Sequence, residues 1–158
     1  MTFQLTMPMP DETAKPRPCR VMLIEDDPDD VYLFERALDS VKAGLRHEVA
    51  LERAGDGLDA AYRVSLEDLT NKLPDVLVLD LNMPRLNGVK FLHALRATLG
   101  LSELPVFVLT TSTAQPVHEE ALRAGADKVF VKPDSADALS AIAVEIVERG
   151  MAFAESRL

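Results

Sequence analysis

Residues 73–84 read LPDVLVLDLNMP, a short apolar run that reaches the carboxylate of Asp80 and is closed by Pro84. The run does not alternate between apolar and polar side chains, which is typical of a strand buried on both faces of a parallel sheet. Open α/β sheets bind their ligands just outside the carboxyl ends of the strands. The pattern therefore places Asp80 where a ligand is expected.

Length and composition indicate one globular domain with no room for a second folded module such as a DNA-binding output. The chain has 158 residues, of which 47% are hydrophobic and 27% charged. The single cysteine, Cys19, can form no internal disulfide and suits the cytoplasm, where we expect the protein to act. No apolar run could span a bilayer, no secretory signal is recognisable, and the net charge of −9 argues against nucleic acid as a partner.

Strand and helix patterns alternate along the chain. The strands are predicted at 20–24, 47–54, 75–80, 105–109 and 129–131, and the helices at about 29–44, 58–69, 88–99, 117–124 and from Asp134 or Ser135 onward, with stops at Gly100 and Gly125. Five such units predict an α/β fold with a doubly wound parallel sheet, and we expect a flavodoxin-like (βα)5 arrangement, in which the first strand is central and the strand order is 2-1-3-4-5. Residues 1–18 are predicted to be a flexible arm, 19–150 the folded domain, and 151–158 an extension of the last helix or a tail.

Polar side chains follow four of the predicted strands. Glu25 and Asp26 follow the first strand, Asp80 the third, Thr110 the fourth and Lys132 the fifth. The first and third strands are neighbours in the expected order, so their carboxylates converge at one edge of the sheet. Two unit charges about 4 Å apart repel by roughly 4 kcal/mol at an effective dielectric of 20, so a cation is required there. Hard oxygen ligands suit Mg²⁺, and Lys132 supplies a second positive charge.

This arrangement suits phosphoryl chemistry. Beside a metal and an ammonium group, the ionised carboxylate of Asp80 can act as a nucleophile toward phosphorus and form an aspartyl phosphate. Catalysis of such a transfer consists mainly of positioning and of stabilising the charge on the phosphoryl oxygens. Mg²⁺, Lys132 and the Thr110 hydroxyl provide separate partners for that charge.

Five sequence blocks carry a resemblance to a known family. They are IEDDP at 24–28, AGDGLDA at 54–60, LDLNMP at 79–84 with NG at 87–88, LTTS at 109–112, and GAD at 125–127 with VKP at 131–133. Together, in this order and after these strands, they resemble the receiver domain of two-component response regulators over about residues 20–150. The resemblance implies that Asp80 accepts a phosphoryl group from a phosphohistidine of a sensor histidine kinase.

The resemblance also implies the roles of the other site residues. Mg²⁺ would be held directly by Asp26, Asp80 and the backbone carbonyl of Asn82, with Glu25 acting through water. Lys132 would pair with the phosphate, and Thr110 would be the switch hydroxyl.

Two further features concern the subfamily and the switch. The long arm and the DLNMP and LTTS blocks look like single-domain regulators that serve phytochrome-type kinases. Val129 stands where an aromatic switch residue is common in the family, three residues before Lys132. Phe130 should point to the opposite face of its strand and cannot replace that aromatic.

We therefore expect a phosphoacceptor signalling protein that catalyses only its own phosphorylation and dephosphorylation. An intermediate carrier in a phosphorelay is the alternative of the same class. An aspartate-nucleophile phosphatase of the haloacid dehalogenase type would need a second acid two residues after Asp80, where Asn82 stands. A passive binding module is disfavoured by the complete set of acids, threonine and lysine.

The remaining side chains have simpler interpretations. Asp27 is expected to cap the first helix. Val144 and Met151 are expected off the buried face of the last helix, followed by Phe153, either as scattered surface hydrophobes or as a homodimer contact through the last helices and strand. The three histidines, His47, His93 and His118, have no metal-ligand spacing and are expected at the surface or at sheet edges, away from the carboxyl edge.

Overall fold

The computed structural model describes residues 17–69, 73–81, 83, 87–98 and 103–156 of this chain. Of the expected N-terminal arm, only Arg17 and Pro18 belong to the described residues. Asn82 and the expected helix stop at Gly100 lie outside them.

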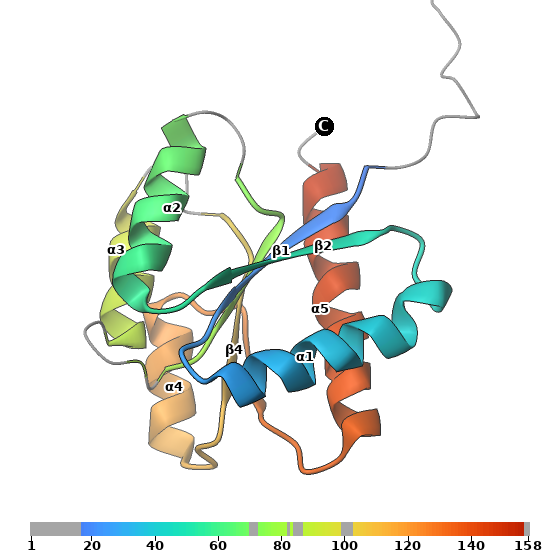
Figure 1. Ribbon diagram of the computed structural model, residues 1–158. Helices are drawn as coiled ribbons and strands as arrows, with labels where there is room; N and C mark the ends of the chain where they lie inside the picture. Colours follow the sequence, from blue (N-terminus) through green and yellow to red (C-terminus); the bar gives the residue numbers. More distant parts are fainter. Residues whose placement is uncertain (1–16, 70–72, 82, 84–86, 99–102, 157–158) are drawn as a thin grey trace, which may run out of the picture.

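Five strands alternate with five α-helices along the described part of the chain, as the hydrophobic patterns predict (Figure 1). In chain order they are β1 (Cys19–Ile24), α1 (Pro28–Val41), the 3-10 helix η1 (Lys42–Gly44), β2 (Val49–Ala54), α2 (Gly57–Leu69), β3 (Val76–Leu79), α3 (Gly88–Ala97), β4 (Val106–Thr110), α4 (Gln115–Ala124), β5 (Lys128–Val131) and α5 (Ala136–Ser156). The alternation of strands and crossover helices is what a parallel sheet requires.

The five strands form one parallel sheet of order β2-β1-β3-β4-β5. This confirms the predicted flavodoxin-like fold and its strand order. Ile24 lies opposite Leu79, and Leu79 lies opposite Val108, so the last residues of the central strands are in register. The residues that follow these strands therefore meet at one edge of the sheet.

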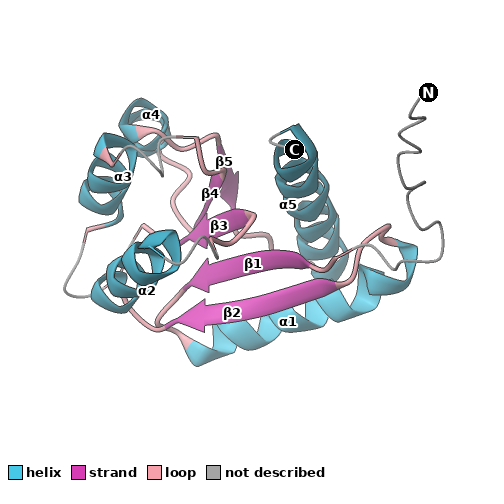
Figure 2. Ribbon diagram, turned by 90° about the horizontal axis from the view of Figure 1, so that it is seen from above, coloured by secondary structure: helices cyan, strands magenta, loops and turns pink. Residues whose placement is uncertain are grey.

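Helices cover both faces of the sheet and bury its apolar side chains (Figure 2). Ile24, Leu79 and Val108 pack on the face covered by α2, α3 and α4. Their neighbours in sequence point to the face covered by α1 and α5, where Phe107 and Phe130 pack with ring centroids 6.1 Å apart. Burial on both faces explains why β3 reads as an unbroken apolar run.

Helix ends follow the expected capping chemistry. The Asp27 side chain accepts a hydrogen bond from the Asp29 N–H at the start of α1, which confirms its predicted role. At the start of α5 it is Ser135, and not Asp134, whose hydroxyl accepts a hydrogen bond, from the Ala138 N–H. The α3 helix ends at Ala97, two residues before the expected end, and Thr98 follows it in an extended conformation.

The prediction that Met151 lies off the buried face of the last helix is wrong. Met151 is buried in the cluster beneath α1 and α5, one turn beyond Val147, which is itself one turn beyond Ala143. Side chains four residues apart share one face of a helix, so Met151 continues the buried stripe.

Among the described helices, none is both long enough and apolar enough to cross a membrane.

Gly125 is the residue that ends α4, and we expect its replacement to be costly. Its φ of 119° lies in the left-handed region, and an added Cβ would lie 2.5 Å from Cγ of Arg96. Arg96 holds this turn through hydrogen bonds from its guanidinium to the carbonyl oxygens of Gly125 and Leu104. Gly125→Ala should lower the free energy of unfolding by about 2–3 kcal/mol, as measured by urea denaturation.

Gly44→Ala is the matched control, since no atom lies within 4 Å of a Cβ built there and its φ is not left-handed. Its effect should stay within about 0.5 kcal/mol. Equal effects of the two substitutions would show that the turn at Gly125 is not a constraint.

Candidate functional site: an acidic cluster at the carboxyl edge

Three carboxylates meet where β1 and β3 end. One oxygen each of Glu25, Asp26 and Asp80 lies within 4.8 Å of the other two. Backbone hydrogen bonds continue the sheet into this cluster: the Glu25 N–H donates to Ala54 O at 3.1 Å and the Asp80 N–H to Ile24 O at 3.1 Å. Glu25 and Asp80 are buried, with 3% and 8% of their surface exposed. Backbone hydrogen bonds and burial therefore hold Glu25 and Asp80 at the end of the sheet, whereas Asp26 is not buried.

Lys132 reaches the cluster from the end of β5. Its ammonium lies 2.7 Å from Asp30 Oδ2, 3.0 Å from Glu25 Oε2 and 3.5 Å from Asp80 Oδ2. The predicted convergence of Lys132 with the acids is therefore present in the structure. Its closest partner is Asp30, which the sequence analysis did not assign to the site.

Asp30 lies in the first turn of α1, where an acid also suits the helix dipole. Because the helix dipole already explains an acid at this position, the contact of Asp30 with Lys132 was not predicted. A usable signal was its position: the first turn of α1 begins at the same edge of the sheet as the cluster, so an acid there can turn toward a lysine at the end of β5.

Thr110 ends β4 and is fully buried. Its hydroxyl accepts a hydrogen bond from the Ser112 N–H at 3.2 Å, and its carbonyl accepts one from the Lys132 N–H at 2.7 Å. Thr110 is therefore joined through the backbone to the residue that carries the site's ammonium group.

His118 corrects one expectation about the histidines. It was expected away from the carboxyl edge, but its Nε2 lies 2.6 Å from the carbonyl oxygen of Ser112, in the loop that follows β4. Since a carbonyl oxygen can only accept, Nε2 carries the proton. The reason is topological: α4 starts directly after that loop, so its first turns lie beside it.

Val129 and Phe130 lie as predicted on opposite faces of β5. Val129 packs against the cluster under α2, α3 and α4, whereas Phe130 belongs to the cluster under α1 and α5. A buried aromatic ring three residues before Lys132 is therefore absent from this site, and Phe130 does not substitute for it.

Burial and the neighbouring charges act in opposite directions on the pKa of Glu25 and on the pKa of Lys132. Burial raises the pKa of Glu25 to about 7, although hydrogen bonds from Lys132 and from the Asp27 N–H act to lower it. Burial by itself would lower the pKa of Lys132, but the ammonium donates hydrogen bonds to Asp30 and Glu25 and lies near the charge of Asp80, so its pKa is raised overall. Lys132 therefore stays charged, and the cluster still carries an excess of negative charge.

The donor set fits a hard divalent cation. The three acids present carboxylate oxygens, the ligands that Mg²⁺ prefers, and a few protein oxygens leave room for the waters that Mg²⁺ usually keeps. Asn82, expected to offer its backbone carbonyl, lies outside the described residues.

The raised pKa of Glu25 predicts a pH dependence of the metal-free protein. Between about pH 4.5 and about pH 7, Glu25 ionises in the unfolded chain but remains largely protonated in the folded one, so the folded state is stabilised at the acid end and loses that stability as the pH rises. Urea denaturation in EDTA should show a loss of up to about 3 kcal/mol across this interval. The Glu25→Gln variant should lose clearly less free energy of unfolding over the same pH interval. A pH dependence equal to that of wild type would show that Glu25 is not the group responsible.

A parallel flavodoxin-like sheet with converging acids and a lysine at its carboxyl edge defines a receiver-type phosphoacceptor protein. The family model described as "Response regulator receiver domain" matches residues 21–144 of this chain. The chain therefore belongs to the response regulator receiver family, whose members accept phosphoryl groups in two-component signalling, typically bind Mg²⁺ and interact with sensor histidine kinases.

Curated relatives share this region with longer proteins. The transcriptional regulatory protein PrrA of Mycobacterium tuberculosis is 39% identical over 117 residues, which are 72% of this chain and 43% of that protein. The autoinducer 2 sensor kinase/phosphatase LuxQ of Vibrio harveyi is 26% identical over 164 residues, 94% of this chain and 18% of that protein. The chain thus spans less than half the length of these two relatives.

Solved structures with similar folds include regulators linked to light sensing. The phosphorylated cyanobacterial phytochrome response regulator RcpA has a TM-score of 0.72 and 25% identity, with 85% of this chain and 94% of that chain covered. A response regulator in red light signaling of R. palustris has a TM-score of 0.69 and 26% identity, with 80% and 89% covered. The Mn²⁺-bound form of Rcp1 has a TM-score of 0.65 and 26% identity, with 82% and 91% covered.

Proposed function

We propose that this chain acts as a single-domain response regulator in the cytoplasm, with Asp80 as its phosphoacceptor. The observation that carries the proposal is the position of the Asp80 carboxylate, which is 3.5 Å from the Lys132 ammonium and belongs to the group of three acids. A carboxylate held between a cation site and a fixed ammonium group is equipped to attack phosphorus. We assign residues 19–150 to the receiver unit, and residues 151–156 continue α5.

In this proposal Asp26, Asp80 and the backbone carbonyl of Asn82 hold Mg²⁺, and Glu25 acts through a water molecule. The Mn²⁺-bound form of Rcp1, 26% identical to this chain, supports a divalent cation at such a site. When bound, the ion neutralises charge on the cluster and on the incoming phosphoryl oxygens.

The transfer itself uses the side chains of this chain. An oxygen of Asp80 forms a bond to phosphorus while the P–N bond to the donor histidine breaks, and the imidazole leaves with the electron pair of that bond and takes up a proton. Lys132 pairs with a phosphoryl oxygen, for which it exchanges one of its present carboxylate partners. The Thr110 hydroxyl turns toward another phosphoryl oxygen, and this exchange alters the hydrogen bond that Thr110 now accepts from Ser112.

The output of such a switch is a change in a protein-binding surface. The rearranged loop after β4 is continuous with α4, β5 and α5, which carry exposed apolar side chains at Leu122 and Val131. We propose this face as the place where a partner or a second copy binds, with Val144 and Phe153 of α5 as further candidates. The likeness to RcpA and to the R. palustris regulator supports a phytochrome-type kinase as the phosphoryl donor.

The test is incubation with acetyl phosphate and Mg²⁺, followed by intact mass measurement. We expect one phosphoryl adduct per chain, and none when EDTA replaces Mg²⁺. Absence of the adduct would contradict the proposal. Sustained release of phosphate from small monoesters would instead favour the hydrolase alternative, and transfer from the adduct to a histidine phosphotransfer domain would favour the relay carrier.

A further inference from the structure

Two carboxylates hold the side chain of Lys132 more tightly than Asp80 does. The ammonium group has three N–H donors, and it donates one hydrogen bond to Asp30 Oδ2 at 2.7 Å and one to Glu25 Oε2 at 3.0 Å. The Asp80 oxygen that pairs with it is farther away, at 3.5 Å, which exceeds the usual length of a strong charge-assisted hydrogen bond. Asp30 and Glu25 therefore fix the ammonium beside Asp80, and its contact with Asp80 itself is the loosest of the three.

The direction of the Asp30 side chain follows from the packing of α1. Asp30 precedes Phe34 by four residues and Ala37 by seven, so it lies on the same face of the helix as these two buried side chains. Its own side chain is 33% exposed. A carboxylate on the buried face of a helix is costly unless it is paired with a cation, and Lys132 is that cation. The rotation of α1 that buries Phe34 thus also fixes the position of Asp30.

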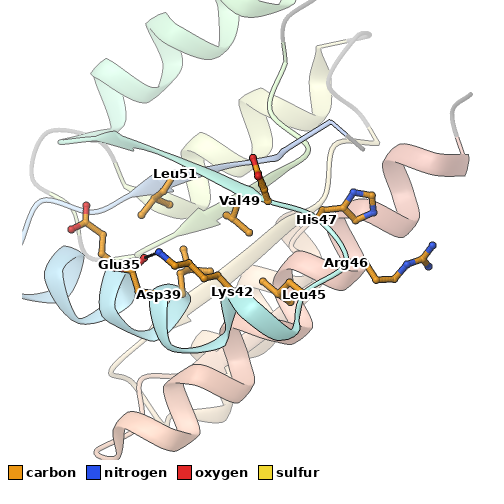
Figure 3. A pocket seen from close by; sticks show the side chains of 10 residues that line it. Glu35, Asp39, Lys42, Leu45, Arg46, His47, Val49 and Leu51 are labelled. Carbon is orange, nitrogen blue, oxygen red and sulfur yellow. Dashed lines mark hydrogen bonds and ion pairs between the residues drawn. The ribbon is translucent and has the colours of Figure 1, made fainter. Parts of the chain in front are cut away.

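Other acids of α1 face elsewhere. Glu35 and Asp39 follow Asp30 by five and nine residues, which places them about 140° and about 180° around the helix axis from it. Both line a groove of about 690 Å³ between α1 and β2 (Figure 3). Asp29, directly before Asp30, is exposed. Within α1, Asp30 is therefore the acid whose position is specific to Lys132.

We propose that Asp30 is a positioning residue for phosphoryl transfer, an inference that rests on the proposed role of Asp80. Asp30 and Glu25 keep hold of the Lys132 ammonium throughout the transfer, and the contact that Lys132 gives up is the long one to Asp80. The third N–H donor then pairs with a phosphoryl oxygen. An ammonium that is fixed in advance needs no reorganisation when charge develops on that oxygen, and it then stabilises the transition state most effectively.

No covalent bond of Lys132 or Asp30 changes in this step. With acetyl phosphate as donor, an oxygen of Asp80 forms a bond to phosphorus while the P–O bond to acetate breaks, and acetate leaves with the electron pair of that bond. Lys132 keeps its proton and its two carboxylate partners. Asp30 therefore acts on the phosphoryl group only through the position of the Lys132 ammonium.

The negative charge of Asp30 and its hold on Lys132 have opposite effects on the rate of phosphorylation. A negative charge near the site repels an anionic donor, so removal of that charge by itself should speed the reaction. Loss of the hold on Lys132 should slow the reaction, because the ammonium is then no longer fixed beside the phosphoryl oxygen. A lower rate after removal of the Asp30 charge is thus the signature of positioning.

The Asp30→Asn variant tests the proposal. Asparagine keeps the size of the side chain and one acceptor oxygen, so the variant should fold, which urea denaturation in EDTA verifies. Its phosphorylation by acetyl phosphate and Mg²⁺, followed by intact mass, should be about tenfold slower than that of wild type. Asp29→Asn is the matched control, since it removes the same charge from the same turn of α1 at an exposed position, and it should react at least as fast as wild type. A rate for Asp30→Asn equal to or above that of Asp29→Asn would overturn the proposal.

The Lys132 ammonium gives a second readout that requires neither phosphorylation nor a metal. In EDTA and at low temperature, ammonium hydrogens held by two carboxylates should exchange with water slowly enough for ¹H–¹⁵N NMR, and Lys132→Met identifies the signal by its loss. Exchange should be about tenfold faster in Asp30→Asn than in wild type and Asp29→Asn, because one charge-assisted hydrogen bond is weakened. A missing signal in wild type, or equal exchange in all three proteins, would refute the role of Asp30.

These outcomes separate the role of Asp30 from the proposed function. If wild type gains no phosphoryl adduct, the role of Asp80 fails. If wild type and Asp29→Asn gain the adduct and Asp30→Asn gains it equally fast, only the role of Asp30 fails.

Discussion

The Asp80→Asn variant should gain no phosphoryl adduct from acetyl phosphate and Mg²⁺, whereas wild type gains one per chain. The reason is chemical: the amide of asparagine is not a nucleophile toward phosphorus, although it fills the same space beside Lys132. The variant should remain folded, because it removes one of three like charges that lie within 4.8 Å of one another. Intact mass gives the adduct, and urea denaturation in EDTA should give a midpoint at least as high as that of wild type.

Asp39→Asn is the matched control for this variant. Asp39 lies in α1, its side chain is 70% exposed, and its ion pair with Lys42 is at the surface. The control should be phosphorylated like wild type. An undiminished adduct on Asp80→Asn, or its loss from Asp39→Asn, would remove Asp80 from its proposed role.

The second large effect is expected from Lys132→Met, which removes the ammonium group but keeps most of the side chain's length. In wild type that ammonium lies within 3.5 Å of carboxylate oxygens of Glu25, Asp30 and Asp80 and is only 15% exposed. The variant leaves these carboxylates without their cation, so its free energy of unfolding in EDTA should fall by about 3 kcal/mol. Phosphorylation by acetyl phosphate with Mg²⁺ should be slower by about a hundredfold, because one stabilising charge on the phosphoryl group is lost.

Lys128→Met is the matched control from the same strand. Lys128 pairs with Glu145 at 2.7 Å, but both side chains are about two-fifths exposed, at 42% and 38%. Its loss should cost about 1 kcal/mol or less and leave the phosphorylation rate unchanged. Similar losses for both lysines would indicate that the cluster does not depend on Lys132.

Much of the fold was predictable because the sheet is buried on both faces. A strand such as 76–79 must then be apolar throughout, while a helix covering the sheet shows a periodic stripe, and the two patterns differ clearly. The end of the last helix was less predictable. Met151 continues a buried stripe that can be recognised only once it is known which elements, α1 and β1, lie beneath it.

The candidate site was predictable to the extent that it consists of strand ends. Glu25, Asp26, Asp80 and Lys132 follow strands of one parallel sheet, and topology brings such positions to one edge. Asp30 and His118 were not found, because each lies in a helix where a simpler role was at hand. Their contacts with Lys132 and with the loop after β4 depend on how the helices are rotated, which packing determines.

The sequence by itself determined the fold class, the strand order and the chemical identity of the acidic cluster around Asp80. Residue type and strand period suffice for the fold class and for the acids at the strand ends, and the strand order follows from the flavodoxin-like arrangement that five βα units usually adopt. Only the tertiary structure decided that Asp30 is the closest partner of Lys132 and that burial shifts the pKa of Glu25. It also decided that a groove lies between α1 and β2, the first strand in the order of the sheet. These features depend on distances between side chains far apart in sequence, and such distances are set by packing.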